Sequence, residues 1–237
     1  MRALGAATLA LVLVLAASGA PAKKSARSEK KGAAPAAPAT WYAQSLTVGD
    51  TPLRFEHFWS KGRRLRAETV VAGLPLLTLV NGEFYYVIDP MRLEGIAVRR
   101  SAQALQADRE RAGERPFGTI GRQLVDRGAE LLRKEEIGGR TCKLYRLTDD
   151  SGRREVWISD DDLALPLRLV IFDRASGAEV RTEFVDWTRE LDLPDTFFEP
   201  DPRVRIERIE YEDYVRRSTE GPVGPAPALY GELLHGR

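Results

Sequence analysis

The chain has 237 residues, and its 36 lysine and arginine side chains nearly balance its 35 aspartate and glutamate side chains, giving a formal net charge of +1. A nucleic-acid-binding domain carries a basic surplus, so the composition argues against that class of protein. The single cysteine, Cys142, excludes an intramolecular disulfide. We expect its thiol to pack as a small apolar group.

Residues 1–22 have the pattern of a secretory signal peptide. Met1 and Arg2 give a positive start, residues 3–19 are almost wholly Ala, Leu and Val, and residues 20–22 (Ala-Pro-Ala) fit a small-x-small cleavage site. The apolar run is short for a permanent membrane span, although an uncleaved anchor is the alternative. We therefore expect a cleaved signal peptide and a mature protein in the periplasm.

Three further segments follow from composition. Residues 23–40 are rich in Lys, Ser, Ala and Pro and contain no large apolar side chain. Such a segment cannot bury enough apolar surface to offset the entropy of ordering it, so we expect a disordered tether. Residues 41–215 have a length typical of one domain. Residues 216–237 are rich in Gly and Pro, and we expect them to form a flexible tail.

The first half of the domain has the pattern of antiparallel strands. In residues 53–59 and again in residues 65–71, apolar and polar side chains alternate, with a turn between the two runs. A period of two is typical of a β-strand. The Asn-Gly pair at residues 81–82 is a strong hairpin signal. We expect a meander of strands that continues to about residue 98.

A helical interruption follows. Residues 101–111 contain good helix formers, and Ser101 is placed to be the N-cap. In residues 116–126, three apolar side chains recur at spacings of three and four, which is typical of an amphipathic helix. We expect these two short helices to lie between two runs of hairpins.

The central stretch, residues 137–171, predicts three consecutive strands joined by turns, and residues 180–187 predict another strand. Residues 204–215 are ambiguous, because β-branched and aromatic content favours a strand while the Glu/Arg spacing allows a helix. We favour the strand. The fold class is therefore mainly β (α+β), with ten or more strands. A sheet of that size closes or curls strongly, and helices must cover one face to keep it from water.

The residues from 139 to 169 resemble the outer-membrane lipoprotein-sorting and carrier proteins of the bacterial periplasm (LolA-like). The central motifs are Gly-x-x-Cys-x-x-Tyr-x-Leu at residues 139–147, Val-Trp-Ile at 156–158 and Leu-Pro-Leu-Arg at 165–168. Supporting motifs are Gly-x-x-Leu-Arg-Ala-Glu at residues 62–68, the hairpin at 81–90 that ends in Asp-Pro, and Asp-x-Phe-Phe-x-Pro at 195–200.

This resemblance implies a strongly curved, antiparallel half-barrel sheet with helices over its mouth, enclosing an apolar cavity for acyl chains. In the family, a strand arginine helps to hold the closed lid. That role falls by position to Arg66, with Arg64 as the nearby competitor. The family's long N-terminal helix is replaced here by the tether, and the carriers contain less arginine. We therefore expect membership of the wider superfamily as a divergent member, and not necessarily the carrier activity itself.

Signals for an enzyme are poor. The chain has two histidines, His57 and His235, and no spacing typical of a transition-metal site. The Asp runs at residues 149–150 and 160–162 could bind calcium, but aspartate is also favoured in turns, and we favour the turn. We expect no catalytic residues, no cofactor and no metal. Composition and resemblance also predict no nucleic-acid partner and a monomer.

We expect the cavity to be lined by Phe55, Trp59, Phe84, Tyr86, Tyr145, Trp157, Leu165, Leu167 and Leu169. We expect Phe117, Ile120 and Leu124 to form a lid and Arg66 to hold it. Each methylene buried in such a cavity would contribute about 0.8 kcal/mol.

Three hypotheses about function follow. The first is a periplasmic protein that binds the acyl chains of a lipid or lipoprotein, for lipoprotein sorting or lipid transport, which would also require transfer partners at the inner and outer membranes. The alternative is an envelope-stress sensor that uses the same fold to detect a lipid or protein and contacts a membrane partner through the tether and tail. The third is an enzyme that uses residues 160–162 or His57.

Overall fold

Residues 39–111 and 115–236 are described by the computed structural model. The predicted signal peptide, residues 1–22, and the predicted tether up to residue 38 lie outside the described residues. Thr40 already belongs to the first strand.

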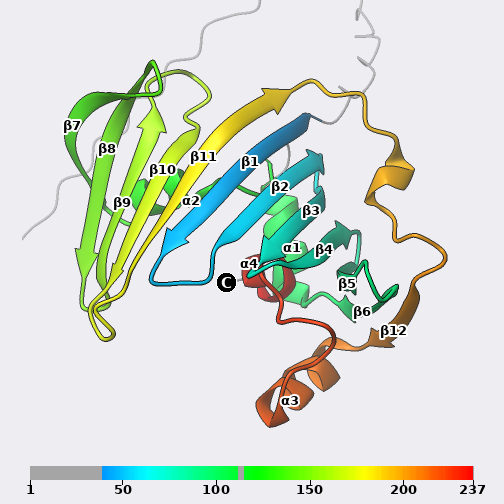
Figure 1. The fold of residues 1–237 in the computed structure, drawn as a ribbon. Helices are drawn as coiled ribbons and strands as arrows, with labels where there is room; N and C mark the ends of the chain where they lie inside the picture. The colour runs from blue at the N-terminus through cyan, green and yellow to red at the C-terminus, as the bar shows by residue number, and fades with distance from the viewer. Residues whose placement is uncertain (1–38, 112–114, 237) are drawn as a thin grey trace, which may run out of the picture. The chain divides into compact units, whose positions relative to one another are not determined.

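One sheet contains all the strands that the described residues form (Figure 1). In chain order these are β1 (Thr40–Gly49), β2 (Arg54–Lys61), β3 (Arg64–Val71), β4 (Leu74–Asn81), β5 (Phe84–Asp89), β6 (Glu94–Arg99), β7 (Glu130–Ile137), β8 (Arg140–Asp149), β9 (Gly152–Ser159), β10 (Pro166–Asp173), β11 (Glu179–Arg189) and β12 (Arg205–Ile209). The helices are α1 (Ala102–Glu110), α2 (Ile120–Asp126), the 3-10 helix η1 (Asp195–Phe198), α3 (Tyr211–Glu220) and α4 (Gly231–His235).

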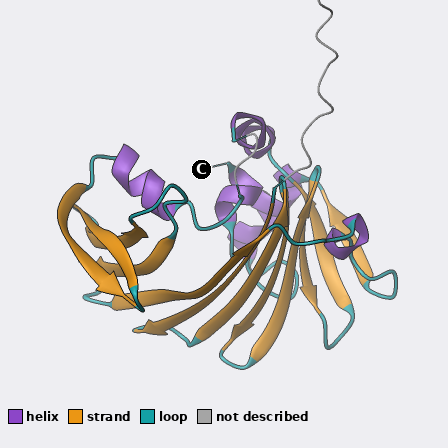
Figure 2. Cartoon of the chain, turned by 90° about the horizontal axis from the view of Figure 1, so that it is seen from above, coloured by secondary structure: helices purple, strands orange, loops and turns teal. Residues whose placement is uncertain are grey.

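The sheet is a long meander that does not close. Its order is β12-β6-β5-β4-β3-β2-β1-β11-β10-β9-β8-β7. The first strand, β1, pairs with β11 and so joins the two runs of hairpins into one surface. Figure 2 shows that the strands form an open arc with helices in its hollow. The predicted half-barrel fold is confirmed, with one correction: β12 pairs with β6 in parallel, so the sheet is mixed.

The short turns have the chemistry that tight hairpins need. Gly62 and Gly82 follow β2 and β4, and each adopts a φ of +59°. A two-residue hairpin turn requires this left-handed conformation, which glycine adopts without steric cost. The predicted cap of α1 is also present, because Ser101 Oγ accepts a hydrogen bond from Ala104 N at 3.0 Å.

The sheet has an inner face, covered by helices, and an outer face. Side chains of neighbouring strands that pair in register share a face. Ala43, Phe58 and Ala67 pair in sequence across β1, β2 and β3, and all are buried in the main core, so we use them to define the inner face. Their chain neighbours Trp59 and Arg66 pair with each other on the outer face. A second core cluster, which contains Cys142, Leu144, Trp157, Leu167 and Val170, packs on the outer face of β8 to β10.

The C-terminal residues pack into the main core. Leu233 and Leu234 of α4 are 1% and 0% exposed, and Val223 is also buried. The prediction of a flexible tail is therefore wrong for residues 216–236. Its Gly and Pro residues permit tight turns, and its few apolar side chains reach the sheet.

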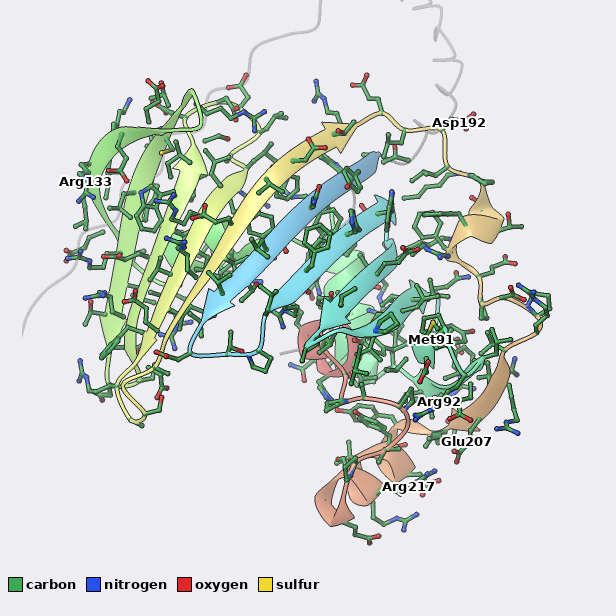
Figure 3. The ribbon with its side chains drawn as sticks, in the orientation of Figure 1. Met91, Arg92, Arg133, Asp192, Glu207 and Arg217 are labelled. Carbon is green, nitrogen blue, oxygen red and sulfur yellow. The ribbon has the colours of Figure 1, made fainter. Side chains whose placement is uncertain are left out.

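The ambiguous stretch before the tail divides into two elements. A strand occupies residues 205–209, as we favoured, but a helix begins at Tyr211. Arg217 Nη1 of α3 pairs with Glu207 Oε1 of β12 at 2.7 Å (Figure 3). Among the described residues, no helix is both long and apolar enough to cross a membrane.

Candidate functional site

Two pockets lie on the inner face, on either side of the segment that precedes α2. The larger has a volume of about 380 Å³, and its walls include Trp41, Val125 and Ile158. The smaller has a volume of about 210 Å³ and lies between α2, α4 and the strands β1, β2, β10 and β11. Gly118 and Thr119 line both pockets. This segment is therefore the partition between them.

Aromatic stacking holds the partition against the sheet. The ring of Phe117 stacks on Phe58, with centroids 5.0 Å apart, and on Trp187, with centroids 5.7 Å apart. The Arg115 guanidinium lies 5.0 Å from the Trp187 ring centroid and 5.3 Å from that of Trp41. A guanidinium at this distance from an aromatic ring is attracted to it. The partition thus depends on the packing of a few side chains.

Glycine at position 118 allows this close approach. Gly118 has a φ of +64°, and a Cβ atom added to it would lie 2.5 Å from Cη2 of Trp187. An L side chain is strained at such a φ and would also collide with the indole. The segment can rest on Trp187 only because this residue lacks a side chain.

The C-terminal segment forms one wall of the smaller pocket. The hydroxyl of Tyr230 donates to Oε1 of buried Glu56 at 2.7 Å and lies 3.0 Å from Thr69 Oγ1. The backbone N–H of Tyr230 donates to the Tyr85 hydroxyl at 3.1 Å. Burial, followed by the charge of Glu56, raises the pKa of Tyr230 well above its ordinary value. Burial raises the pKa of Tyr85 to about 12.

The predicted lid residues lie together beside the pockets. Phe117 is buried in the main core, while Leu124 is fully buried and clusters with Ile120, Val156 and Ile158. These contacts place Ile120 and Leu124 between α2 and the inner face, and Phe117 against the inner face in the segment before α2. Whether they open and close stays a prediction.

The predicted cavity residues do not line one cavity. Tyr145 and Leu169 both lie on the inner face, because each pairs with Val156. Trp157 and Leu167 lie in the outer-face cluster. Phe55, Trp59, Phe84 and Tyr86 pair with outer-face residues of the neighbouring strands. Leu165 is fully buried.

The cause of this error is the composition of the strands. β2 carries large side chains on both faces, so the alternation that reveals the strand cannot say which set is covered by helices. The residues that sequence reasoning missed are Trp41 and Phe58 on the inner face and Tyr230 in the C-terminal segment. No local signal in the sequence distinguishes Phe58 from Phe55, since both are aromatic residues of one strand.

The predicted role of Arg66 is wrong. It lies on the outer face, opposite the lid residues. Its Nη1 donates to the carbonyl oxygen of Phe197 at 3.2 Å, its guanidinium lies 4.6 Å from the Phe197 ring centroid, and its other nitrogens pair with Glu68. Arg64 Nη1 pairs with Asp195 at 2.8 Å. Both arginines therefore bind η1 and do not reach the lid.

The polar residues that we considered for catalysis or metal binding have structural partners. His57 Nδ1 is 2.8 Å from the Tyr42 hydroxyl, and its ring stacks on Trp59. Asp160 pairs with Lys134 and Lys143, and these two ammonium groups lower its pKa. Asp161 accepts hydrogen bonds from the backbone of its own turn. In the part of the chain that the structure describes, no three His, Cys, Asp or Glu side chains are grouped to hold a metal.

Comparison with known proteins gives a partial family match and a shared fold. Residues 125–211 match the family described as "Predicted periplasmic protein (DUF2092)". No curated protein matches the sequence. A solved structure of an uncharacterized conserved protein from Thermus thermophilus is similar, with a TM-score of 0.51, 12% identity and coverage of 72% of this chain and 90% of that one.

Two other solved structures are similar at lower scores. One chain of the Pseudomonas aeruginosa MucA/MucB complex has a TM-score of 0.44 and 11% identity, over 72% of this chain and 59% of that one. An outer membrane lipoprotein-sorting protein domain from Vibrio parahaemolyticus has a TM-score of 0.33 and 11% identity, over 71% of this chain and 92% of that one. The predicted resemblance to lipoprotein-sorting proteins is confirmed, as a likeness of fold at low identity.

Proposed function

We propose that the protein is a periplasmic lipid-binding protein that holds an acyl chain in the inner-face pockets of its curved sheet. The observation that carries this proposal is the pair of pockets separated by the Gly118–Thr119 partition. The leader pattern of residues 1–22 and the family match at residues 125–211 support the location. The role is binding and transfer, not catalysis.

The larger pocket has the size and lining that a small apolar ligand needs. Its volume of about 380 Å³ is within the range of about 300–1,000 Å³ typical of ligand pockets. Trp41, Tyr145 and Ile158 supply apolar wall. Each methylene that enters contributes about 0.8 kcal/mol, so a chain of several methylenes would supply most of the affinity.

Access would come from movement of α2 and the partition. The helix has seven residues, and isolated helices shorter than about 12 residues are marginal in water. Its stability therefore depends on packing by Phe117, Ile120 and Leu124 against the sheet. Elements held by few buried contacts open at low free-energy cost. A chain that crosses from one pocket to the other would displace the partition in this way.

The finer role that we propose is carriage of a lipid or lipoprotein between membranes, by a monomer that exchanges its ligand with membrane partners. A carrier must release what it binds, and a ligand held mainly by apolar contact under a short helix suits that requirement.

A pocket-filling substitution tests the proposal. Val125 of α2 is 39% exposed and lines the larger pocket, whereas Val215 of α3 is 40% exposed and lies on another helix. We expect Val125→Trp to weaken binding of a fluorescent fatty acid about tenfold, because the indole fills the space for the chain. Val215→Trp, the matched control, leaves the Kd unchanged. Equal Kd values in both variants and the wild type would contradict the proposal, as would no displaceable binding to the wild type.

A further inference from the structure

We propose that the larger pocket selects an amphiphile with an anionic headgroup, a carboxylate or a phosphate, which lies among Arg115, Arg122 and Lys143. The chain of the amphiphile points toward the partition and the smaller pocket. This inference rests on the proposed function and adds the chemical class of the ligand.

The charged side chains that line the larger pocket are mostly cationic. Of the residues that the structure describes, Arg115, Arg122 and Lys143 line it together with one carboxylate, that of Asp161. Arg122 and Val125 lie three residues apart on one face of α2, Thr119 directly precedes the helix, and all three line the pocket. A purely apolar ligand would make no use of the charge on this wall.

Lys143 faces the pocket from the sheet. It pairs in register with Ile158, as Tyr145 pairs with Val156, so both side chains of β8 lie on the inner face. Lys143 shares the carboxylate of Asp160 with Lys134. Two ammonium groups on one carboxylate leave a positive charge at this edge of the pocket.

The carboxylate of Asp161 is engaged in its own turn. Its Oδ1 accepts from Ser159 Oγ at 2.7 Å, from Leu163 N at 3.0 Å and from Ala164 N at 3.1 Å. These three hydrogen bonds stabilise the negative charge of Asp161 within its own turn. Arg115 is positioned by a hydrogen bond from Nη2 to the Gly118 carbonyl oxygen at 3.1 Å and by the rings of Trp41 and Trp187. An anion there would receive charge-assisted hydrogen bonds, which are the stronger class.

The smaller pocket has the opposite charge balance, which fixes the direction of the ligand. Its charged lining residues, among those that the structure describes, are Glu56, Glu232 and Arg54. Glu56 is 3% exposed and lies 3.2 Å from Arg54 Nε. An anionic head is therefore disfavoured in the smaller pocket, while the apolar residues Phe184 and Leu169 there accept the end of a chain.

The experiment compares three ligands with one chain length: dodecanoate, dodecyl phosphate and methyl dodecanoate. Their Kd values are measured on the full chain by displacement of a fluorescent fatty acid. We expect at least one anion to bind about tenfold more tightly than the ester, since charge-assisted bonds to the arginines are made only by the anions. The tighter of the two anions identifies a carboxylate or a phosphate as the headgroup.

Two substitutions, one in α2 and one just after it, distinguish the effect of a cation in this pocket from the effect of positive charge elsewhere on the protein. Arg122→Gln should reduce the preference for the anion to less than about threefold and leave ester binding unchanged. Arg127→Gln is the matched control, because Arg127 follows α2 but its side chain pairs with Asp149 at 3.3 Å. It should keep the preference. Equal binding of anions and ester to the wild type overturns this inference while the proposed function stands. Failure of all three ligands to bind overturns both.

Discussion

Gly118 decides how closely the partition can approach the sheet. Its positive φ and its missing Cβ both matter, because the indole of Trp187 occupies the space where a side chain would be. Gly128, just after α2, has a φ of +90°, but no atom lies within 4 Å of the place that a Cβ would take there. Substitutions at the two glycines therefore distinguish the free-energy cost of backbone strain from the cost of a collision with Trp187.

We expect Gly118→Ala to lower the free energy of unfolding by about 2–4 kcal/mol, because strain at positive φ adds to overpacking against Trp187. Gly128→Ala should cost about 1 kcal/mol, from strain alone. Urea unfolding measures both. Equal losses would contradict the close approach of the partition.

Buried tyrosines on the inner face predict a loss of stability at alkaline pH. The pKa of Tyr85 is raised from 10.0 to about 12, and that of Tyr230 is raised in the same direction. A raised pKa means that the folded state holds the proton more tightly than the unfolded state does. The stabilisation is therefore full below about pH 10 and is lost as the pH rises toward about 12.

For Tyr85 this loss amounts to about 3 kcal/mol. Tyr85→Phe removes the titrating hydroxyl, so the unfolding free energy of the variant should fall less steeply over that pH range. The check is a series of urea midpoints at increasing pH. A slope identical to that of the wild type would show that Tyr85 does not titrate with folding.

At the scale of elements, the two faces of the sheet have different roles. The inner face carries the two pockets of the proposed site and α2, while the outer face, which has pockets of its own, binds η1 through Arg64 and Arg66. These two arginines of the sequence motif at residues 62–68 therefore hold η1 (Asp195–Phe198) against the outer face. Leu65 and Ala67 of the same motif are buried in the main core on the inner face.

Substitution of Arg66 tests this division. Arg66→Leu removes the hydrogen bond to the Phe197 carbonyl and the contact with its ring. We expect a loss of about 1–2 kcal/mol in the free energy of unfolding. The Kd and the dissociation rate of a fluorescent fatty acid should not change. A faster release without a loss of stability would instead favour a lid-holding role.

The positions of the helices and strands are easier to predict from the sequence than the face of the sheet on which each side chain lies. The hairpin at residues 81–82, the helical interruption and the strands of the central stretch all follow from local patterns. The face of each strand does not, because β2 and β8 carry large apolar residues on both sides. Tyr145 lines the larger inner-face pocket, while Phe55 and Trp59 lie on the outer face and line other pockets there. The choice depends on where helices pack, which is a tertiary property.

At the scale of the whole described unit, the C-terminal residues complete the core. Composition suggested a loose tail, since Gly and Pro are frequent in loops. The Arg100 guanidinium donates to the Leu233 carbonyl at 2.6 Å, and Ser101 Oγ donates to the His235 carbonyl at 2.8 Å. These long-range bonds join α4 to the start of α1, and no local pattern predicts them.

We expect Leu234→Ala to lower the free energy of unfolding by about 2–5 kcal/mol, because the side chain is 0% exposed and its loss leaves a cavity. Leu74→Ala is the control, since Leu74 is 69% exposed and should cost no more than about 0.5 kcal/mol. Chemical denaturation distinguishes the two. Similar small losses in both would mean that the C-terminal segment is not part of the cooperative fold.

Native mass spectrometry of the protein purified from a periplasm tests the central claim, that the inner-face pockets hold an acyl chain. The proposed function predicts an added mass that fragments to an acyl species in the wild type and in Val215→Trp. The same mass should be much less abundant in Val125→Trp, whose side chain fills the larger pocket. A bare protein mass in the wild type, or an adduct that persists equally in Val125→Trp, would contradict the account.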